Sequence, residues 1–419
     1  MAAPFLYKYK LVLITEKKKR YNITKFIQDL SWAEKEKELA ARITFMAKNS
    51  KTSKGRLSSL AKPGCWVILS YSYNGGAYKE AVRGKIVEWN PSTKATGEQF
   101  SVKAYDLLYD LQESADNIYF PKGRKTPILL REIFKKWGIP MGAYSGPNIK
   151  HGKEVFRNQK LGKVVFDILE EANNKGGVEA IPRAEKNKVS IVAYGSNQKV
   201  FHLSQTKNIT NISHKVSTVG MVTRVKVVGQ EKSKGKNKGK APVYATVNGN
   251  IQYGIRQKLY VRNKKDSMKK AKKEAQKILK EEGSPKNEVS VKTFDLPFVR
   301  KGHTVSLSST TANGYYYVMS VTHNCDERTM DLDLKKVPQA SLGEASKSKK
   351  KYHVGDVVTF IGGHKQYSSA KGKKGTKIKG SGKAKIKKIK NGAKHPYYLA
   401  TRNWSKSRIH GWVDKKAFN

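Results

Sequence analysis

Short segments that alternate apolar and polar residues are the feature that most constrains the fold of this chain. Four of them lie within residues 8–89, with glycine-bearing turns between them: KYKLVLIT, ARITFMA, CWVILSYSY and VRGKIVEW. A period of two is typical of strands that bury one face of a sheet. The pattern therefore predicts a β-barrel or β-sandwich up to about residue 100.

The chain then becomes mixed. AYDLLYDLQ (104–112) indicates a strand running into a helix, and helices are expected at 126–138 and 160–177, each closing on glycine. The strand pattern returns from about Ser213 and is interrupted by one helix at 266–282. Asp266 or Ser267 would cap this helix and Gly283 would end it. Its narrow apolar stripe consists of Met268, Ala271, Ala275, Ile278 and Leu279.

These patterns predict a mainly β, α+β chain with five parts. They are a β domain at 1–105, an α/β domain at 106–200, a β domain at 201–336 with the inserted helix 266–282, a linker at 337–350 and a small β module at 351–419. Two lysine- and glycine-rich stretches, 228–242 and 373–383, are expected to be flexible loops.

The net charge of +51 indicates an anionic partner: nucleic acid, a cell surface or an acidic protein. The last part of the chain, from Val337 to Asn419, carries 21 Lys and Arg against 3 Asp and Glu, and so +18 of this total. The remaining positive charge is spread along the rest of the chain. This distribution argues against a single basic arm.

Catalytic and metal motifs are not found in the sequence. It has no GxGxxG, phosphate-binding loop, HExxH or GxSxG, and its nine histidines form no cluster with metal-ligand spacing. Cys65 and Cys325 are expected to be buried, and HNCDERTMD (323–331) to be a turn between two strands. We therefore predict no enzyme, no cofactor and no metal site. No signal peptide or membrane span is expected either.

The C-terminal module ends on aromatic residues among lysines. Its pattern, GDVVTFIGGHKQYSS, GKAKIKKI, KHPYYL and GWV, resembles bacterial SH3-like domains of phage tail and cell-wall-targeting proteins. The resemblance implies a small β-barrel that binds cell wall or a protein ligand. A ligand pocket would use Tyr367, Tyr397, Tyr398, Trp404 and Trp412, with His364 and His395 at its rim. Alternatively, Trp412 and one tyrosine form the core of the barrel.

The first 336 residues resemble the baseplate hub proteins of contractile phage tails and phage-tail-like bacteriocins. The features that carry this resemblance are DLSWAEKEKELAARITF, RGKIVEW, SVKAYDLLYDLQ, ILLREIFKKWGIP, RKGHTVSLSS, YYYVMSVTHN and MDLDLKKV. The resemblance implies two tube-like β-barrel domains flanking an α/β domain, with Trp32 and the AYD at 104–106 as structural residues. It also implies a homotrimer that joins a hexameric tail tube to a trimeric central spike and contacts other baseplate proteins.

Two other classes of function stay open at this stage. One is a tail-associated cell-wall-degrading enzyme, for which candidate residues are lacking. The other is a basic nucleic-acid-binding protein, which would bind with steep salt dependence. The hub interpretation predicts assembly in the bacterial cytoplasm and release as part of an extracellular particle. Peptidoglycan or anionic wall polymers would then be ligands of the last module.

Overall fold

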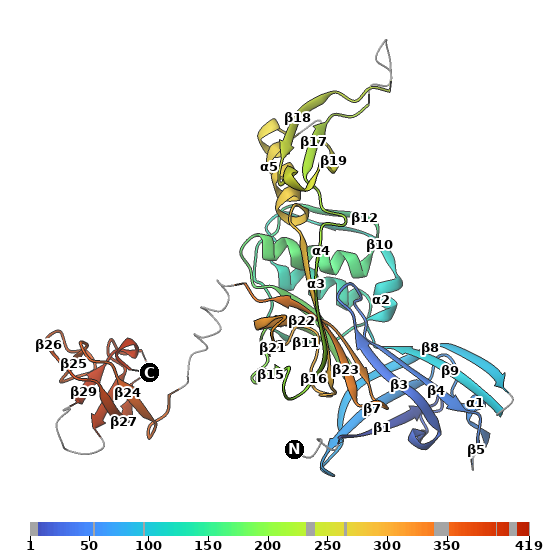
Figure 1. Ribbon diagram of the computed structural model, residues 1–419, viewed down its shortest axis with the longest axis horizontal. Helices are drawn as coiled ribbons and strands as arrows, with labels where there is room; N and C mark the ends of the chain where they lie inside the picture. The colour runs from blue at the N-terminus through green and yellow to red at the C-terminus, as the bar shows by residue number, and fades with distance from the viewer. Residues whose placement is uncertain are drawn as a thin grey trace. The chain divides into compact units, whose positions relative to one another are not determined.

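The protein divides into two compact units in a computed structural model (Figure 1). They are Met1–Pro338, the N-terminal unit, and Gln339–Asn419, the C-terminal unit. The structure describes residues 7–52, 55–94, 97–231, 239–263, 266–338, 352–390, 392–401 and 409–418. The predicted linker 337–350 lies, beyond residue 338, outside the described residues, as do residues 232–238 of the predicted loop at 228–242.

A 13-stranded sheet dominates the N-terminal unit. Its first half has the order β3-β4-β9-β8-β7-β1-β2. These strands are β1 (Tyr7–Ile14), β2 (Arg20–Asn22), β3 (Ile27–Glu34), β4 (Arg42–Lys48), β7 (Trp66–Tyr73), β8 (Lys79–Lys94) and β9 (Gly97–Tyr105). Smaller elements between them are η1 (Thr24–Phe26), β5 (Lys51–Thr52), β6 (Gly55–Arg56) and α1 (Leu57–Leu60).

The second half of the sheet comes from the end of the unit. Its order is β16-β20-β23-β22, with β21 beside β22 and β15 beside β21. These strands are β15 (Phe201–Ser204), β16 (Ile209–Ser217), β20 (Lys286–Phe294), β21 (Thr304–Ser308), β22 (Asn313–Asn324) and β23 (Thr329–Lys336). β22 pairs antiparallel with β3, from Val321 opposite Glu34 to Asn324 opposite Ser31, so the two halves form one sheet.

The mainly β fold class is confirmed, but the strand pairing differs from two closed barrels. Among the described strands the hydrogen-bonded order is an open path from β16 to β2. The reason lies at β3. A strand has only two edges, and β3 uses one for β4 and the other, at Ser31–Glu34, for β22.

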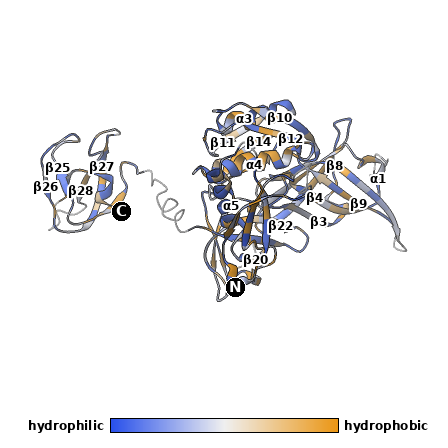
Figure 2. Ribbon diagram, turned by 90° about the horizontal axis from the view of Figure 1, so that it is seen from above, coloured by the Kyte–Doolittle hydropathy of each residue, from blue (hydrophilic) through white to orange (hydrophobic). Residues whose placement is uncertain are grey.

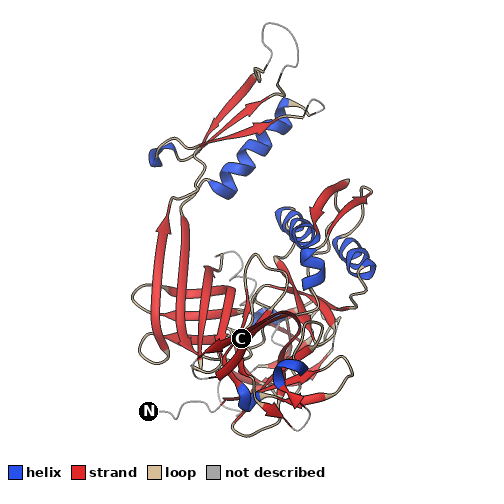
Figure 3. Cartoon of the chain, turned by 90° about the vertical axis from the view of Figure 1, so that its right-hand side faces the viewer, coloured by secondary structure: helices blue, strands red, loops and turns tan. Residues whose placement is uncertain are grey.

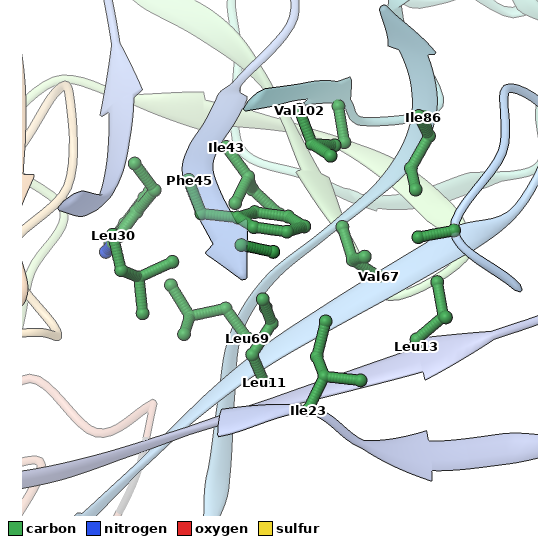
Figure 4. Close-up of a cluster of buried hydrophobic side chains, with 14 of the residues drawn as sticks. Leu11, Leu13, Ile23, Leu30, Ile43, Phe45, Val67, Leu69, Ile86 and Val102 are labelled. Atoms are coloured by element: carbon green, nitrogen blue, oxygen red, sulfur yellow. The ribbon is translucent and has the colours of Figure 1, made fainter. Parts of the chain in front are cut away.

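Alternation along the strands builds the core of the first half, as the sequence predicts. β4 buries Ile43, Phe45 and Ala47, and the residues between them face outward. Its apolar side chains interlock with those of the neighbouring strands (Figure 4). The labelled members of this cluster are Leu11, Leu13, Ile23, Leu30, Ile43, Phe45, Val67, Leu69, Ile86 and Val102.

An α/β region lies between the two halves in sequence and has its own core. It comprises α2 (Tyr109–Glu113), β10 (Ala115–Phe120), α3 (Thr126–Lys136), β11 (Met141–Tyr144), β12 (Glu154–Lys160), α4 (Leu161–Asn174), β13 (Ala180–Glu185) and β14 (Lys188–Ala193). The predicted helices are confirmed. α3 begins with Pro127 near its N-terminus, and Gly138 and Gly176 follow α3 and α4 with φ of 65° and 87°. Such positive φ angles favour glycine and end a helix.

The helix predicted at 266–282 is α5 (Met268–Glu282), but it does not stand alone. It packs on a separate three-stranded sheet of β17 (Arg224–Val228), β18 (Val243–Asn248) and β19 (Gln257–Val261), with η2 (Ile251–Tyr253) before β19 (Figure 3). The sequence prediction of a β domain interrupted only by a helix is therefore wrong. Val225 and Val227 face α5 instead of the core of the large sheet.

Ser267 is the N-cap of α5. Its hydroxyl accepts a hydrogen bond from the backbone N–H of Lys270 at 3.2 Å. Ala271 and Ala275 form the buried centre of the predicted stripe, whereas most of the helix surface is hydrophilic (Figure 2).

Replacing this N-cap should weaken the small module formed by β17, β18, β19 and α5. We expect Ser267→Ala to lower the free energy of unfolding of this module by about 1 kcal/mol, because one backbone donor loses its acceptor. Hydrogen exchange of the amides of α5 measures the effect. The matched control is Ser213→Ala, at an exposed position of β16; equal exchange rates in both variants would contradict the capping role.

The C-terminal unit is a six-stranded sheet of order β24-β27-β28-β29-β25-β26. The elements are β24 (Val357–Phe360), β25 (Lys365–Tyr367), β26 (Gly375–Lys377), β27 (Gly382–Ile389), β28 (Tyr397–Thr401), β29 (His410–Val413) and η3 (Lys415–Ala417). Phe360, Ile386 and Leu399 lie in its core. The stretch 373–383, predicted to be a loop, contains β26, because Lys365–Tyr367 pair with it. Across the described residues of both units, no helix is long and apolar enough to cross a membrane.

Candidate ligand-binding face and the joint of the large sheet

Three strands of the C-terminal unit place aromatic rings in one row. Trp412 of β29 lies between Tyr398 of β28 and Tyr367 of β25 in the strand register. Residues directly opposite each other in paired strands point to the same face, so these three rings share a face of the sheet. The rings of Tyr398 and Trp412 meet edge to face at 5.5 Å. All three side chains are half-buried, which leaves ring surface accessible to a ligand.

His410 joins this row, although it is not among the residues predicted to line the pocket. It lies two residues before Trp412 in β29, and its Nδ1 is 2.7 Å from the Tyr398 hydroxyl. The alternation in IHGWV carried this signal, because residues two apart in a strand point the same way. We call Tyr367, Tyr398, His410 and Trp412 the aromatic face.

Tyr397 lies on the opposite side of the sheet from Tyr398. Neighbouring residues of a strand point to opposite faces, so the two tyrosines cannot line one pocket. Tyr397 packs against the core, with its ring 5.2 Å from Phe418 and 5.8 Å from Tyr352. The predicted core role therefore holds for one tyrosine, Tyr397, but not for Trp412, which lies on the same face as Tyr398.

His395 is buried, and its ring packs against the ring of Tyr367. The two rings stack at 3.5 Å with an angle of 9° between their planes. Its Nε2 is 3.0 Å from the Gly372 carbonyl oxygen, and its Nδ1 is 2.7 Å from an Asp414 carboxylate oxygen. His395 thus positions a ring of the aromatic face and does not lie at its rim.

One of the two remaining predicted site residues, His364, is not brought to the aromatic face. His364 is half-buried before β25, with its ring 6.5 Å from that of Phe360. Trp404 lies outside the described residues. Gly411 allows the tight approach that the sequence predicted, because a Cβ there would lie 3.0 Å from the Tyr367 carbonyl oxygen.

Exposed lysines lie beside the aromatic face and near the loop that holds His395. Lys388 of β27 is directly opposite Tyr398 in the strand register, and it is exposed. Lys371, Lys373 and Lys374 are exposed next to Gly372, whose carbonyl holds His395. Flat rings with cations beside them can stack on sugars or peptides while attracting anionic groups.

A second group of residues lies at the joint between the halves of the large sheet. Trp32 of β3 is fully buried and stacks on His323 of β22 at 4.1 Å. The Glu34 carboxylate accepts two hydrogen bonds from the Arg300 guanidinium, each 2.8 Å, and one of 3.0 Å from the Lys301 backbone N–H. We call these five residues the joint.

The charged groups of the joint are buried. Burial raises the pKa of the Glu34 carboxyl, but the Arg300 guanidinium outweighs burial and holds that pKa well below its usual range. The Lys301 ammonium donates to the Lys35 and Glu38 carbonyl oxygens at 2.9 and 2.8 Å. The sequence predicted Trp32 to be structural, but no local pattern marks the partners, which lie 266 residues away from Glu34.

Comparison with known proteins gives matches to one family and to several solved structures. The profile of the YQBQ-like family matches residues 30–335. No curated protein matches the chain. The 43 kDa tail protein of prophage MuSo2 from Shewanella oneidensis is similar in structure, with a TM-score of 0.56 and 11% identity over 78% of this chain and 98% of that one.

The tail protein of Neisseria meningitidis MC58 gives a similar result. Its TM-score is 0.55 and its identity 13%, over 78% of this chain and 96% of that one. At these identities the two matches show a shared fold. Together with the family match, they confirm the resemblance of the first 336 residues that was stated from the sequence.

Proposed function

Because this chain belongs to the YQBQ-like family of phage tail and baseplate hub-like proteins, we propose that it is a structural hub in the baseplate of a contractile, phage-tail-like particle. In this role it joins the hexameric tail tube to the trimeric central spike. It assembles in the bacterial cytoplasm and leaves the cell as part of the finished particle.

The joint is the observation that carries this proposal. A hub transmits force between the tube and the spike, so its β halves must not move against each other. Here β3 and β22 make them one hydrogen-bonded sheet, and a buried ion pair and a stacked ring pair cross the same boundary. Three copies with two β halves each would present six similar surfaces to a hexameric tube and a threefold axis to a spike.

Reconstitution tests the proposed partners. The full chain is mixed with the tube and spike proteins of the same particle, and the complexes are sized by chromatography with light scattering. We expect a complex with three copies of this chain and three of the spike protein. Failure to bind either partner would contradict the hub role.

The C-terminal unit would act as a docking module. We propose that the aromatic face stacks on cell-wall glycan or peptide, or on another baseplate protein, while the exposed lysines beside it attract anionic wall polymers. Only residues on one side of the sheet would take part. Tyr397, which is also predicted for the pocket, is therefore not part of the proposed docking surface.

Removing one ring from the aromatic face should weaken wall binding without unfolding the unit. We expect Tyr398→Ala and Trp412→Ala each to reduce the affinity for purified cell walls by about tenfold, the equivalent of about 1.4 kcal/mol. Co-sedimentation with purified walls measures this. The control is Tyr315→Ala, an exposed tyrosine of β22 in the other unit. Equal binding by all three variants would show that the aromatic face is not the docking surface.

We also propose that the role of the protein is not enzymatic. Its membership of the YQBQ-like family and the fold that it shares with phage tail proteins support this proposal. Zymography against purified sacculi is the test, and a zone of clearing would identify a wall-degrading enzyme instead. Binding of single-stranded DNA with steep salt dependence would favour the nucleic-acid alternative.

A further inference from the structure

Three potential metal ligands converge in the α/β region, away from the joint. They are His151, in the loop before β12, Glu154, the first residue of β12, and Glu171 on α4. One donor atom from each lies within 4.8 Å of the others. The His151 Nδ1 is 2.8 Å from Glu171 Oε2 and 4.0 Å from Glu154 Oε1. His151 is buried, and both carboxylates are partly shielded.

The second nitrogen of His151 is held from outside the cluster. Its Nε2 is 3.0 Å from the hydroxyl oxygen of Thr126, the first residue of α3. That hydroxyl is 3.2 Å from the Ile149 carbonyl oxygen, to which it can donate its only proton. When Nδ1 binds a metal ion, Nε2 carries the ring proton and can donate it to this hydroxyl. A histidine fixed through its other nitrogen is the usual arrangement at metal sites.

The two carboxylate oxygens of Glu171 have different partners. Oε1 pairs with the Lys175 ammonium one turn along α4, whereas Oε2 faces His151. The lysine therefore neutralises one side of the carboxylate and leaves the other available. The three donor atoms lie close enough together for a single cation to contact all of them.

From this geometry we infer that His151, Glu154 and Glu171 form a binding site for a divalent transition metal ion of the Zn²⁺ class. An imidazole nitrogen with two carboxylate oxygens suits Zn²⁺, whereas Mg²⁺ and Ca²⁺ prefer oxygen ligands alone. A water molecule would complete the coordination. The bound ion fastens the loop before β12 to α4 and, through Thr126, to the start of α3.

Equilibrium dialysis of the full, untagged chain against Zn²⁺, with the metal measured by mass spectrometry, tests the site. We expect one ion per chain, retained in excess Mg²⁺. Glu154→Gln should abolish this stoichiometric binding while keeping the fold, because the amide has the size of the carboxylate and can donate to Glu171. The matched control is Glu170→Gln, which removes the same charge from the exposed neighbour of Glu171 on α4.

Two further variants separate coordination from general charge. Thr126→Val should lower the Zn²⁺ affinity by roughly 10- to 100-fold, because the histidine loses its orienting partner. Lys175→Met should raise the affinity, because a competing cation is removed. Circular dichroism confirms that each variant is folded. No Zn²⁺ uptake by the parent chain above that of Glu154→Gln, or equal uptake by the two glutamine variants, would overturn the proposal.

Discussion

Arg300→Met should lower the free energy of unfolding of the N-terminal unit by about 3–5 kcal/mol. The substitution leaves the Glu34 carboxylate buried, with 6% of its side chain exposed and without its bidentate partner. Removing one member of a buried ion pair costs more than the pair itself contributes, because the remaining charge stays desolvated. Differential scanning calorimetry of the full chain measures the loss in the transition of this unit.

Two controls distinguish this mechanism from general damage. The double variant Glu34→Gln, Arg300→Met should recover a large part of the stability, since no unpaired charge remains. Lys103→Met removes a salt bridge to Glu88 whose side chains are about half exposed, and should cost less than about 1 kcal/mol. Equal losses of stability in Arg300→Met and Lys103→Met would show that the buried ion pair does not hold the two halves of the sheet together.

The ion pair between Glu34 and Arg300 should also make the stability of the protein depend on pH in acid. Arg300 holds the pKa of Glu34 in the folded protein below its value in the unfolded chain, so protons bind the unfolded chain first as the pH falls. The contribution of the ion pair to the free energy of unfolding is fully present above the pKa of a glutamate in the unfolded chain, about 4.3. It is lost as the pH falls below that value. Glu34→Gln should therefore remove part of the pH dependence of unfolding below about pH 4, and leave the slope at neutral pH unchanged.

Phe360→Ala should unfold the C-terminal unit while the N-terminal unit remains folded. Phe360 is fully buried, and deleting such a ring costs about 3–5 kcal/mol. The core of a unit this small rarely supplies more than about 3–5 kcal/mol, so the loss removes most of its stability. We expect wall binding to disappear and particle assembly to persist.

Protease digestion followed by mass spectrometry shows which unit has opened. Val357→Ala, at an exposed position three residues earlier in β24, should leave the unit folded, because surface substitutions change stability by about 0.5 kcal/mol or less. Loss of the calorimetric transition of the N-terminal unit in Phe360→Ala would contradict the independence of the two units.

The sequence predicted the elements whose causes are local. Alternation located β4 and its buried Ile43 and Phe45, and glycines with positive φ marked the ends of α3 and α4. Ser267 was recognised as a cap because a capping hydroxyl acts within three residues. The motifs of the aromatic tail likewise located Tyr398 and Trp412, which the fold places side by side.

Features that depend on distant partners could not be predicted in this way. β17 has the alternation of a strand in the large sheet, and only the packing of α5 on Val225 and Val227 assigns it to a separate module. Tyr397 and Tyr398 cannot be distinguished in the sequence, because both are tyrosines in the same motif. The orientation of β28 turns Tyr397 toward the core and Tyr398 toward Trp412. The sequence analysis excluded a metal site on spacing, yet the fold brings Glu171 to His151 from 20 residues away.

The number of copies of this chain per particle tests the hub role most directly. Particles are purified from the native, induced host, and quantitative mass spectrometry with labelled peptide standards compares this chain with the tube protein. The proposed trimeric hub predicts about three copies per particle, against six per ring of the tube. Absence from the particles, or a number that rises with the length of the tube, would contradict a baseplate hub.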